Sequence, residues 1–240
     1  MYGLSAGQEQ LSSKEFVDEA IIRLKNKFDY DKVKRKVLRV QDEVVGDFVR
    51  LNFAEAMKFI DSPTKYAVDS DRAQMRDRAI RAFGVSTGLR AFEIAQVLYI
   101  DLINKKGPLE GLVVQKGKGL KRRFVAYWSE FQPMFDIVKE YIDVFNIRDG
   151  YLFRPFNSRM MDKLDTGPMT VRNIEYVIQD TLYETQLSAH DMRRTFAFIA
   201  YYEFKKTVDE IQWQLGHSDP KTTRKYIGLD INDPRMNNNV

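Results

Sequence analysis

The sequence predicts a mainly α-helical chain with one small antiparallel β-sheet, an α+β fold. Apolar residues recur at helical spacing through most of the 240 residues. The pattern changes where two short runs of strand-forming residues, 111–115 and 122–127, flank the glycine-rich segment 116–121, which is typical of a β-hairpin. Hydrophobic residues make up 44% of the chain, which is enough for a packed core.

The helices before the hairpin are bounded by start and stop signals. Ser12 and Glu15 have the spacing of a capping box at the head of the first one. Ser62-Pro63 ends the third, because the residue before a proline avoids helical backbone angles. The expected helical ranges are 12–28, 31–46, 52–60, 70–85 and 90–100.

Side chains that can cap a helix N-terminus divide the second half of the chain. Thr170, Ser188, Thr207 and Asp219 each precede a helical pattern. The expected elements are a helix over 130–146, a brief strand over 150–153 and helices over 170–184, 190–204 and 207–216, followed by a last helix from 219 that carries Tyr226. The polar tail after Asp230 is expected to be frayed.

Composition excludes several classes of site. The chain has no cysteine, which rules out disulfides, thiolate metal sites and cysteine nucleophiles and suits a reducing cytoplasm. The first ten residues lack the apolar core of a signal peptide, and no stretch approaches the length of a transmembrane helix. We therefore expect a cytoplasmic protein without a membrane partner.

Positive charge is clustered, although the net charge is only +4. Residues 23–39 hold eight Lys or Arg and two Asp, and residues 116–123 hold five basic residues and no acid. Such clusters fit a polyanion such as DNA, and they equally fit a solvated helix face and a solvated turn.

Both histidines of the chain lie in its C-terminal part. His190 precedes Arg193 by three residues, which places the two side chains on one side of a helical turn. His217 precedes Tyr226 by nine residues. A single histidine at a helix start is more often a cap or a surface residue than a catalyst. Here, however, both histidines of the chain lie near an arginine or a tyrosine in the C-terminal part, which favours a shared site.

The reaction chemistry is narrowed by what the sequence lacks. It holds no paired carboxylates for hydrolysis, no metal-ligand spacing and no Walker-type phosphate loop. Arginines that grip phosphate oxygens, histidine donors, a lysine acid and a phenol remain. Phosphoryl transfer depends mainly on positioning and charge stabilisation, so such a set can work without a metal or another cofactor, with tyrosine as the nucleophile.

Four motifs resemble the tyrosine recombinase, or phage-type integrase, family. They are Ser86–Glu93 (STGLRAFE), Gly117–Arg122 (GKGLKR), His190–Phe196 (HDMRRTF) and Leu215–Ser218 (LGHS) followed by Thr222–Tyr226 (TTRKY). The last motif is the most specific one. The four occur in the family's order across about three fifths of the chain, and the resemblance implies the catalytic-domain fold of DNA breaking-rejoining enzymes.

The resemblance implies a role for each matched residue. Arg90 and Arg193 clamp the scissile phosphate, and His217 adds a hydrogen bond there. His190 lies close to the same phosphate and assists proton transfer. Tyr226 attacks phosphorus to leave a 3′-phosphotyrosine and a free 5′-hydroxyl.

Two further residues support this chemistry in the family. Lys118 is expected to protonate the leaving oxygen, with Lys116 and Lys121 as rivals that otherwise contact phosphates. Glu93 supports the site from behind Arg90, and its plainer interpretation is an i,i+3 ion pair. The remaining expected DNA contacts are Arg122, Arg123, Arg194, Lys221, Arg224 and Lys225.

The resemblance also implies a domain division. Residues 48–240 correspond to the catalytic domain, and residues 1–47 form a short helical segment that is a remnant or fragment of a core-binding domain. Fourteen residues follow Tyr226, and their Asp-Pro and Asn-rich composition argues against a docked C-terminal helix.

The predicted function is site-specific, metal-independent DNA recombination or integration for a mobile genetic element. The expected partners are double-stranded DNA, further copies of the chain in a tetramer on paired sites, and accessory DNA-bending or directionality proteins. We expect association with the nucleoid when DNA is bound. The alternatives are a type IB topoisomerase-like enzyme, a non-catalytic DNA-binding regulator on the same scaffold, and a helical scaffold with incidental motifs.

Overall fold

The computed structural model describes residues 48–67, 70–102, 111–114, 122–156 and 164–229. The expected helices over 12–28 and 31–46, the hairpin turn with Lys116, Lys118 and Lys121, and the tail after residue 229 lie outside these ranges. The chain divides into two units after Phe48, and only the second is described below.

The described part is mostly helical with one two-stranded antiparallel sheet, which confirms the predicted fold class. Helix α3 (Phe53–Asp61) begins at Asn52, whose side chain forms a capping box with Glu55. Helix α4 (Asp71–Thr87) begins at Ser70 and ends at Gly88, which adopts φ +63°. Glycine suits this position because an L side chain is strained at a positive φ.

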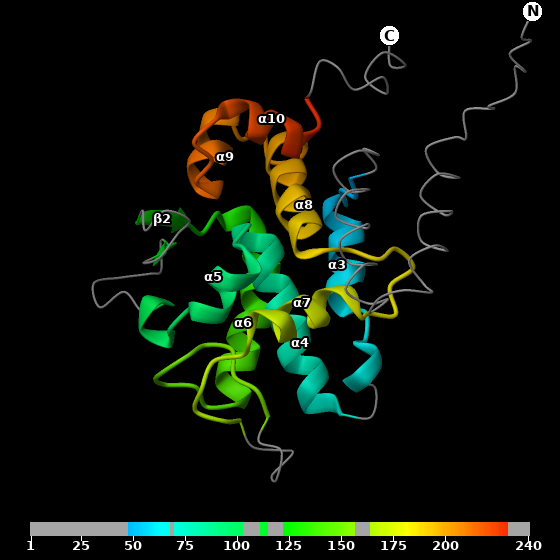
Figure 1. Cartoon of the computed structure of the whole chain (residues 1–240), viewed down its shortest axis with the longest axis vertical. Helices are drawn as coiled ribbons and strands as arrows, with labels where there is room; N and C mark the ends of the chain where they lie inside the picture. Colours follow the sequence, from blue (N-terminus) through cyan, green and yellow to red (C-terminus); the bar gives the residue numbers. More distant parts are fainter. Residues whose placement is uncertain (1–47, 68–69, 103–110, 115–121, 157–163, 230–240) are drawn as a thin grey trace, which may run out of the picture. The chain divides into compact units, whose positions relative to one another are not determined.

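Helix α4 lies at the centre of the core. It packs against α3, α6 (Gln132–Val144), α7 (Val171–Gln179) and α8 (Ala189–Tyr202) (Figure 1). Aromatic side chains fill the spaces between these helices: Phe83 contacts Phe153 edge-on, and Phe131 stacks on Phe196. Burying each such ring stabilises the fold by roughly 1.5–3 kcal/mol, so the site below rests on a rigid framework.

Helix α5 (Ala91–Gln96) is shorter than the predicted 90–100. The backbone turns at Val97 because that residue's carbonyl accepts a 2.8 Å hydrogen bond from the amide of Leu152. Leu98 pairs with Tyr151 in a single β-bridge, and a short 3₁₀ turn, Tyr99–Leu102, follows. The predicted strand over 150–153 is therefore reduced to this bridge, because long-range backbone bonds override the local pattern.

Helix α7 also ends earlier than predicted, at Gln179 instead of 184. The amide of Asp180 closes the last turn on Tyr176, and the carbonyl of Asp180 accepts from the amide of Lys65. Thr181 forms a bridge with Thr64. Helix α6 starts at Gln132 after a 3₁₀ turn, Ser129–Phe131, so the predicted helix over 130–146 is confirmed with one tighter turn at its start.

The two strands β1 (Gly111–Val114) and β2 (Arg123–Ala126) pair in antiparallel register, with Leu112 opposite Val125. Helix α9 (Val208–Leu215) packs on β2 and on α8, and α10 (Pro220–Ile227) packs on α8 and α9 (Figure 1). Capping side chains start α8, α9 and α10 at Ser188, Thr207 and Asp219, as predicted. None of the helices in the described ranges combines the length and apolar character needed to cross a bilayer.

Candidate active site

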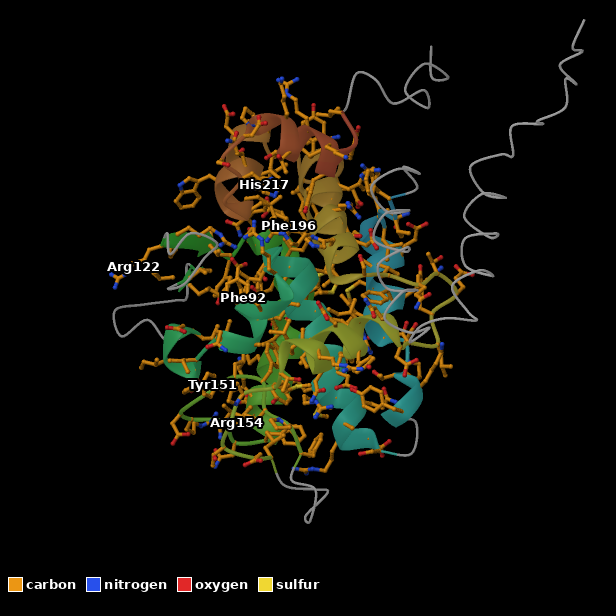
Figure 2. All side chains as sticks on the ribbon, in the orientation of Figure 1. Phe92, Arg122, Tyr151, Arg154, Phe196 and His217 are labelled. Carbon is orange, nitrogen blue, oxygen red and sulfur yellow. The ribbon has the colours of Figure 1, made fainter. Side chains whose placement is uncertain are left out.

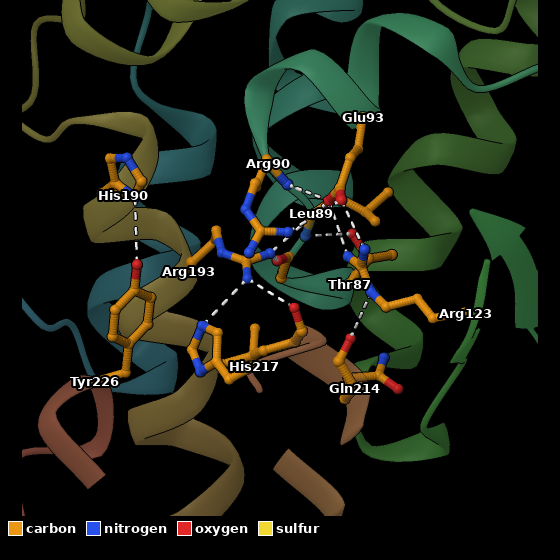
Figure 3. A network of polar contacts seen from close by, with 12 residues as sticks. Thr87, Leu89, Arg90, Glu93, Arg123, His190, Arg193, Gln214, His217 and Tyr226 are labelled. Carbon is orange, nitrogen blue, oxygen red and sulfur yellow. Dashed lines mark hydrogen bonds and ion pairs between the residues drawn. The ribbon is translucent and has the colours of Figure 1, made fainter. Parts of the chain in front are cut away.

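Five of the predicted catalytic residues come together in one site. Arg90 stands at the N-terminus of α5, His190 and Arg193 lie on α8, His217 follows α9, and Tyr226 lies on α10 (Figure 3). Arg90 is far from the other four in sequence; α8, α9 and α10 pack on one another, α5 packs on α4 and α7, and α4 also packs on α8, which brings these segments to one place. Lys118 belongs to the segment that the structure does not describe.

Arg193 is buried at the centre of the site, with 1% of its side chain exposed. Its guanidinium donates Nη1 to the carbonyl of Gly88 and Nη2 to the carbonyl of Leu215, the latter at 2.9 Å. Burial, reinforced by the positive charge of Arg90, lowers the pKa of this guanidinium to about 9, so the group is charged at neutral pH. Its buried Nε has no hydrogen-bond partner among the described residues.

Arg90 caps α5 together with Glu93. The backbone amide of Arg90 donates to Oε2 of Glu93 at 2.9 Å, and its Nη1 donates to Oε1 at 3.1 Å. A quarter of the Arg90 side chain is exposed. The ion pair that the i,i+3 spacing predicted is present, and it places the second guanidinium close to the first.

Glu93 has a second partner that the sequence pattern missed. Arg123, the first residue of β2, donates Nη1 and Nη2 to the two carboxylate oxygens at 2.6 and 2.8 Å. Its Nε donates to the carbonyl of Gln214 at 3.2 Å. Only 11% of the side chain of Arg123, one of the expected DNA contacts, is exposed, so this residue lies largely inside the protein.

The electrostatics of the site follow from this arrangement. Burial on its own would raise the pKa of Glu93, but the hydrogen bonds and charge of Arg123, with those of Arg90 and Arg193, lower it to about 2. Glu93 is therefore ionised at neutral pH. One carboxylate faces three guanidinium groups, which leaves a net charge of +2 to attract an anion.

Gln214 fastens α9 to the sheet. Its side-chain oxygen accepts from the amide of Ala126 at 3.0 Å, and its Nε2 donates to the carbonyl of the same residue at 2.8 Å. The amide group thus continues the hydrogen-bond ladder on the side of β2 that β1 does not occupy. This contact holds the end of α9, and with it His217, against β2.

His217 is held through both ring nitrogens. Nε2 lies 3.4 Å from Nη2 of Arg193, and Nδ1 lies 3.0 Å from Oγ1 of Thr223. Burial and the neighbouring guanidinium groups, Arg193 first, lower the pKa of His217 to about 3, so the ring is neutral. Because a guanidinium cannot accept a hydrogen bond, Nε2 must accept here, and Nδ1 carries the proton that it donates to Thr223.

Tyr226 lies on α10 between the two histidines. Its hydroxyl is 3.3 Å from Nδ1 of His190, and its ring packs edge-on against His217 with centroids 4.7 Å apart (Figure 3). The guanidinium carbon of Arg194 lies 5.5 Å from the centre of the Tyr226 ring. Burial and the charges of Arg193, Arg194 and Arg90 lower the pKa of His190, so this ring is neutral at pH 7.

Arg50 is a further residue that sequence reasoning missed. Its Nε and Nη2 donate to the backbone carbonyls of Tyr226 and Lys225 at 2.8 and 2.6 Å. A positive group is favourable there because the last carbonyls of a helix carry partial negative charge. The sequence pattern gives little indication of this role, because 176 residues separate Arg50 from Tyr226.

The other predicted DNA contacts are at the surface. The side chain of Arg122 points outward from the hairpin (Figure 2). Lys221, Arg224 and Lys225 are exposed on α10, while Arg194 is partly buried and pairs with Asp191 at 2.7 Å. In the described ranges, no group of three His, Asp or Glu side chains is close enough to hold a metal ion.

Comparison with protein families and curated proteins connects this chain to known proteins. The phage integrase family model matches residues 50–232. Tyrosine recombinase XerC of Leptospira interrogans is 27% identical over 195 residues, which are 80% of this chain and 57% of the relative. XerC of Pseudomonas fluorescens is 29% identical over 165 residues, covering 69% of this chain and 52% of the relative. The chain thus spans a little over half the length of these two relatives.

Solved structures with the same fold are recombinases and integrases. XerA recombinase has a TM-score of 0.55 at 24% identity, over 79% of this chain and 61% of that one. A lambda integrase fragment, residues 75–356, was solved as a dimer bound to a core site. It has a TM-score of 0.53 at 14% identity, and the match covers 96% of this chain and 84% of that one. At these identities the likeness concerns the fold.

Proposed function

The chain belongs to the phage integrase family, and on that premise we propose that it breaks and rejoins DNA through a covalent tyrosine intermediate. The observation that carries the proposal is the convergence of Arg90, Arg193, His217, His190 and Tyr226 on one site. Guanidinium and imidazole groups around a phenol suit a phosphodiester, which carries negative charge and has a phosphorus atom open to attack.

The guanidinium groups of Arg90 and Arg193 bind the non-bridging oxygens of the scissile phosphate. Arg193 is preorganised for this task, because the carbonyls of Gly88 and Leu215 each accept a hydrogen bond from its guanidinium and fix its orientation. A bound phosphate adds negative charge beside His217 and raises the pKa of that ring, which favours a protonated Nε2 that donates a hydrogen bond to a phosphate oxygen in place of its contact with Arg193.

Tyr226 is the nucleophile. Its hydroxyl transfers the proton to neutral His190 as the phenol oxygen bonds to phosphorus. The bond between phosphorus and the 5′-oxygen breaks, and Lys118 protonates the departing oxygen, with Lys116 and Lys121 as the other candidates in the same segment. The products are a 3′-phosphotyrosine and a free 5′-hydroxyl, and the reverse reaction rejoins a strand.

The proposed partner is double-stranded DNA, and a lambda integrase fragment with the same fold has been solved bound to DNA. Arg122, Lys221, Arg224 and Lys225 contact backbone phosphates in this proposal, and Arg194 lines the approach to Tyr226. We assign Arg123 to the interior of the site instead, because Glu93 and Gln214 take up its guanidinium.

Recombination on paired sites further requires that several copies assemble on DNA, and we propose a tetramer, with accessory proteins that bend DNA or set direction. In the same proposal, residues 48–240 form the catalytic domain, residues 1–47 form a helical segment that precedes it, and the protein acts in the cytoplasm at the nucleoid.

A nicked suicide substrate tests the chemistry, because the cleaved end diffuses away and traps the covalent complex. We expect the chain to form an adduct with a library of such substrates, and Tyr226→Phe to lose it while binding the same DNA. Tyr202→Phe, which alters an exposed tyrosine on α8, is the matched control and should form the adduct normally. Adduct formation by Tyr226→Phe would show that another residue is the nucleophile.

The same assay separates the alternative functions. We expect cleavage to continue in the presence of a chelator, because arginines supply the positive charge at the phosphate. Relaxation of supercoiled plasmid without a preferred sequence would favour the topoisomerase-like alternative. DNA binding with no adduct on any substrate would favour the non-catalytic regulator.

A further inference from the structure

The carboxylate of Glu93 lies where it competes with a phosphate. Its oxygens are 3.1 Å from Nη1 of Arg90 and 3.9 Å from Nη1 of Arg193, the two groups that our proposed function assigns to the phosphate. A carboxylate and a phosphate oxygen attract the same guanidinium fork. A buried carboxylate with only these two partners would therefore draw both away from the substrate.

Arg123 offers Glu93 a better partner. Its two contacts, 2.6 and 2.8 Å, are shorter than those from the side chains of Arg90 and Arg193 to the same carboxylate. They engage both oxygens at once in the side-by-side geometry that makes arginine–carboxylate pairs strong. Glu93 takes only Nη1 of the Arg90 guanidinium, which leaves Nε and Nη2 with no hydrogen bond among the described residues and available to another acceptor.

The surroundings hold Arg123 in this pairing. Its Nε donates to the carbonyl of Gln214, and its stem packs against Gly216, where an added Cβ would lie 2.7 Å from Cδ of Arg123. The neighbouring Arg122 is exposed, because successive residues at the start of a strand point to opposite faces. Two adjacent arginines thus have different environments, one outside and one inside the site.

We propose that Arg123 is a positioning residue that holds the Glu93 carboxylate and thereby keeps Arg90 and Arg193 available for the scissile phosphate. This inference rests on the proposed function for the identity of the anion. It assigns to Arg123 a role in anion affinity and cleavage rate, and it assigns to Arg122 only a contribution to DNA affinity.

The first experiment measures anion binding without any DNA cleavage, so it tests the inference even if the proposed reaction is wrong. The chain has two histidines, both in the site, so the imidazole NMR signals report on it directly. We expect sulfate to shift the His217 signals in the wild-type protein. In Arg123→Gln the sulfate affinity should fall about tenfold, the effect of losing one charge-assisted hydrogen bond.

The Glu93→Gln background distinguishes competition from loss of structure. With the carboxylate neutral, Arg123 has nothing to hold, and Arg123→Gln in this background should change sulfate affinity less than about twofold. Arg123→Lys, which keeps the charge but not the planar fork, should give an intermediate affinity. Thermal unfolding of each variant identifies any that does not fold, and the comparison within the Glu93→Gln background remains valid in that case.

The second experiment follows adduct formation on the suicide substrate. Arg123→Gln should slow the covalent step about tenfold or more with unchanged DNA affinity, and the double variant with Glu93→Gln should recover part of the rate. Arg122→Gln should weaken DNA binding most at low salt and reduce the salt dependence of binding, and it should slow the covalent step less than Arg123→Gln does. Arg148→Gln, at a surface ion pair with Asp143, controls for net charge.

The inference is overturned if Arg123→Gln binds sulfate as the wild type does, or if the loss is equally large in the Glu93→Gln background. It is also overturned if the two arginine variants slow the covalent step alike. A wild-type protein that binds sulfate but forms no adduct on any substrate contradicts the proposed function alone.

Discussion

The hydroxyl of Tyr226 lies 3.3 Å from Nδ1 of His190, across the interface between α10 and α8. The charges around His190 are mainly positive, and together with burial they keep its ring neutral at pH 7. A neutral imidazole beside a phenol can accept the phenolic proton. This pair therefore gives the proposed reaction a definite dependence on pH.

Substitution of His190 by Gln should slow adduct formation about a hundredfold, the scale of general base catalysis. In the wild type the ring loses its ability to accept a proton when pH falls through its pKa, which lies below 6.5. Adduct formation under limiting enzyme should therefore decline only in the acid range below pH 6.5. If the rate of adduct formation declines at acid pH in His190→Gln just as in the wild type, the decline belongs to the titration of another group.

Glu93 should make the free energy of unfolding depend on pH in the acid range. Its folded-state pKa of about 2 is below the unfolded value of 4.5, so its contribution is complete above pH 4.5 and is lost as pH falls towards 2. The loss is on the order of 3 kcal/mol. The free energy of unfolding, measured with urea, should fall less steeply from pH 6 to pH 3 in Glu93→Gln than in the wild type. Glu184→Gln, at an exposed side chain, should keep the wild-type slope.

Replacement of Gly216 by Ala should lower both stability and cleavage. Gly216 has φ +66°, and a Cβ there would meet Cδ of Arg123 at 2.7 Å. Left-handed backbone alone costs an L residue about 1–2 kcal/mol. Gly167→Ala is the matched control, because nothing lies within 4 Å of its added Cβ. Equal melting temperatures for the two variants would contradict the contact with Arg123.

Arg50 should affect the covalent step through the position of α10. Arg50→Gln removes two hydrogen bonds to the carbonyls of Lys225 and Tyr226, which costs roughly 1–3 kcal/mol of stability. We expect slower adduct formation with DNA affinity retained, and partial rescue by Arg50→Lys. Arg148→Gln again serves as the charge control. Wild-type rates in a destabilised Arg50→Gln would restrict Arg50 to a structural role.

The helix starts were predictable because capping is local. Each capping side chain accepts a hydrogen bond from the amide three residues later, so a short stretch of sequence contains both partners. This holds for Asn52, Ser70, Ser188 and Thr207. The ends of α5 and α7 were predicted too late. They are set by bonds from Leu152 and Lys65, which no local window contains.

The sequence by itself determined the fold class, the family and the set of candidate catalytic residues, because spacing along one chain is enough to recognise its motifs. The tertiary structure decided which of two adjacent arginines lies inside the site and that Arg50 supports the helix of Tyr226. Both depend on partners 30 and 176 residues away, and such contacts exist only after distant helices have packed together.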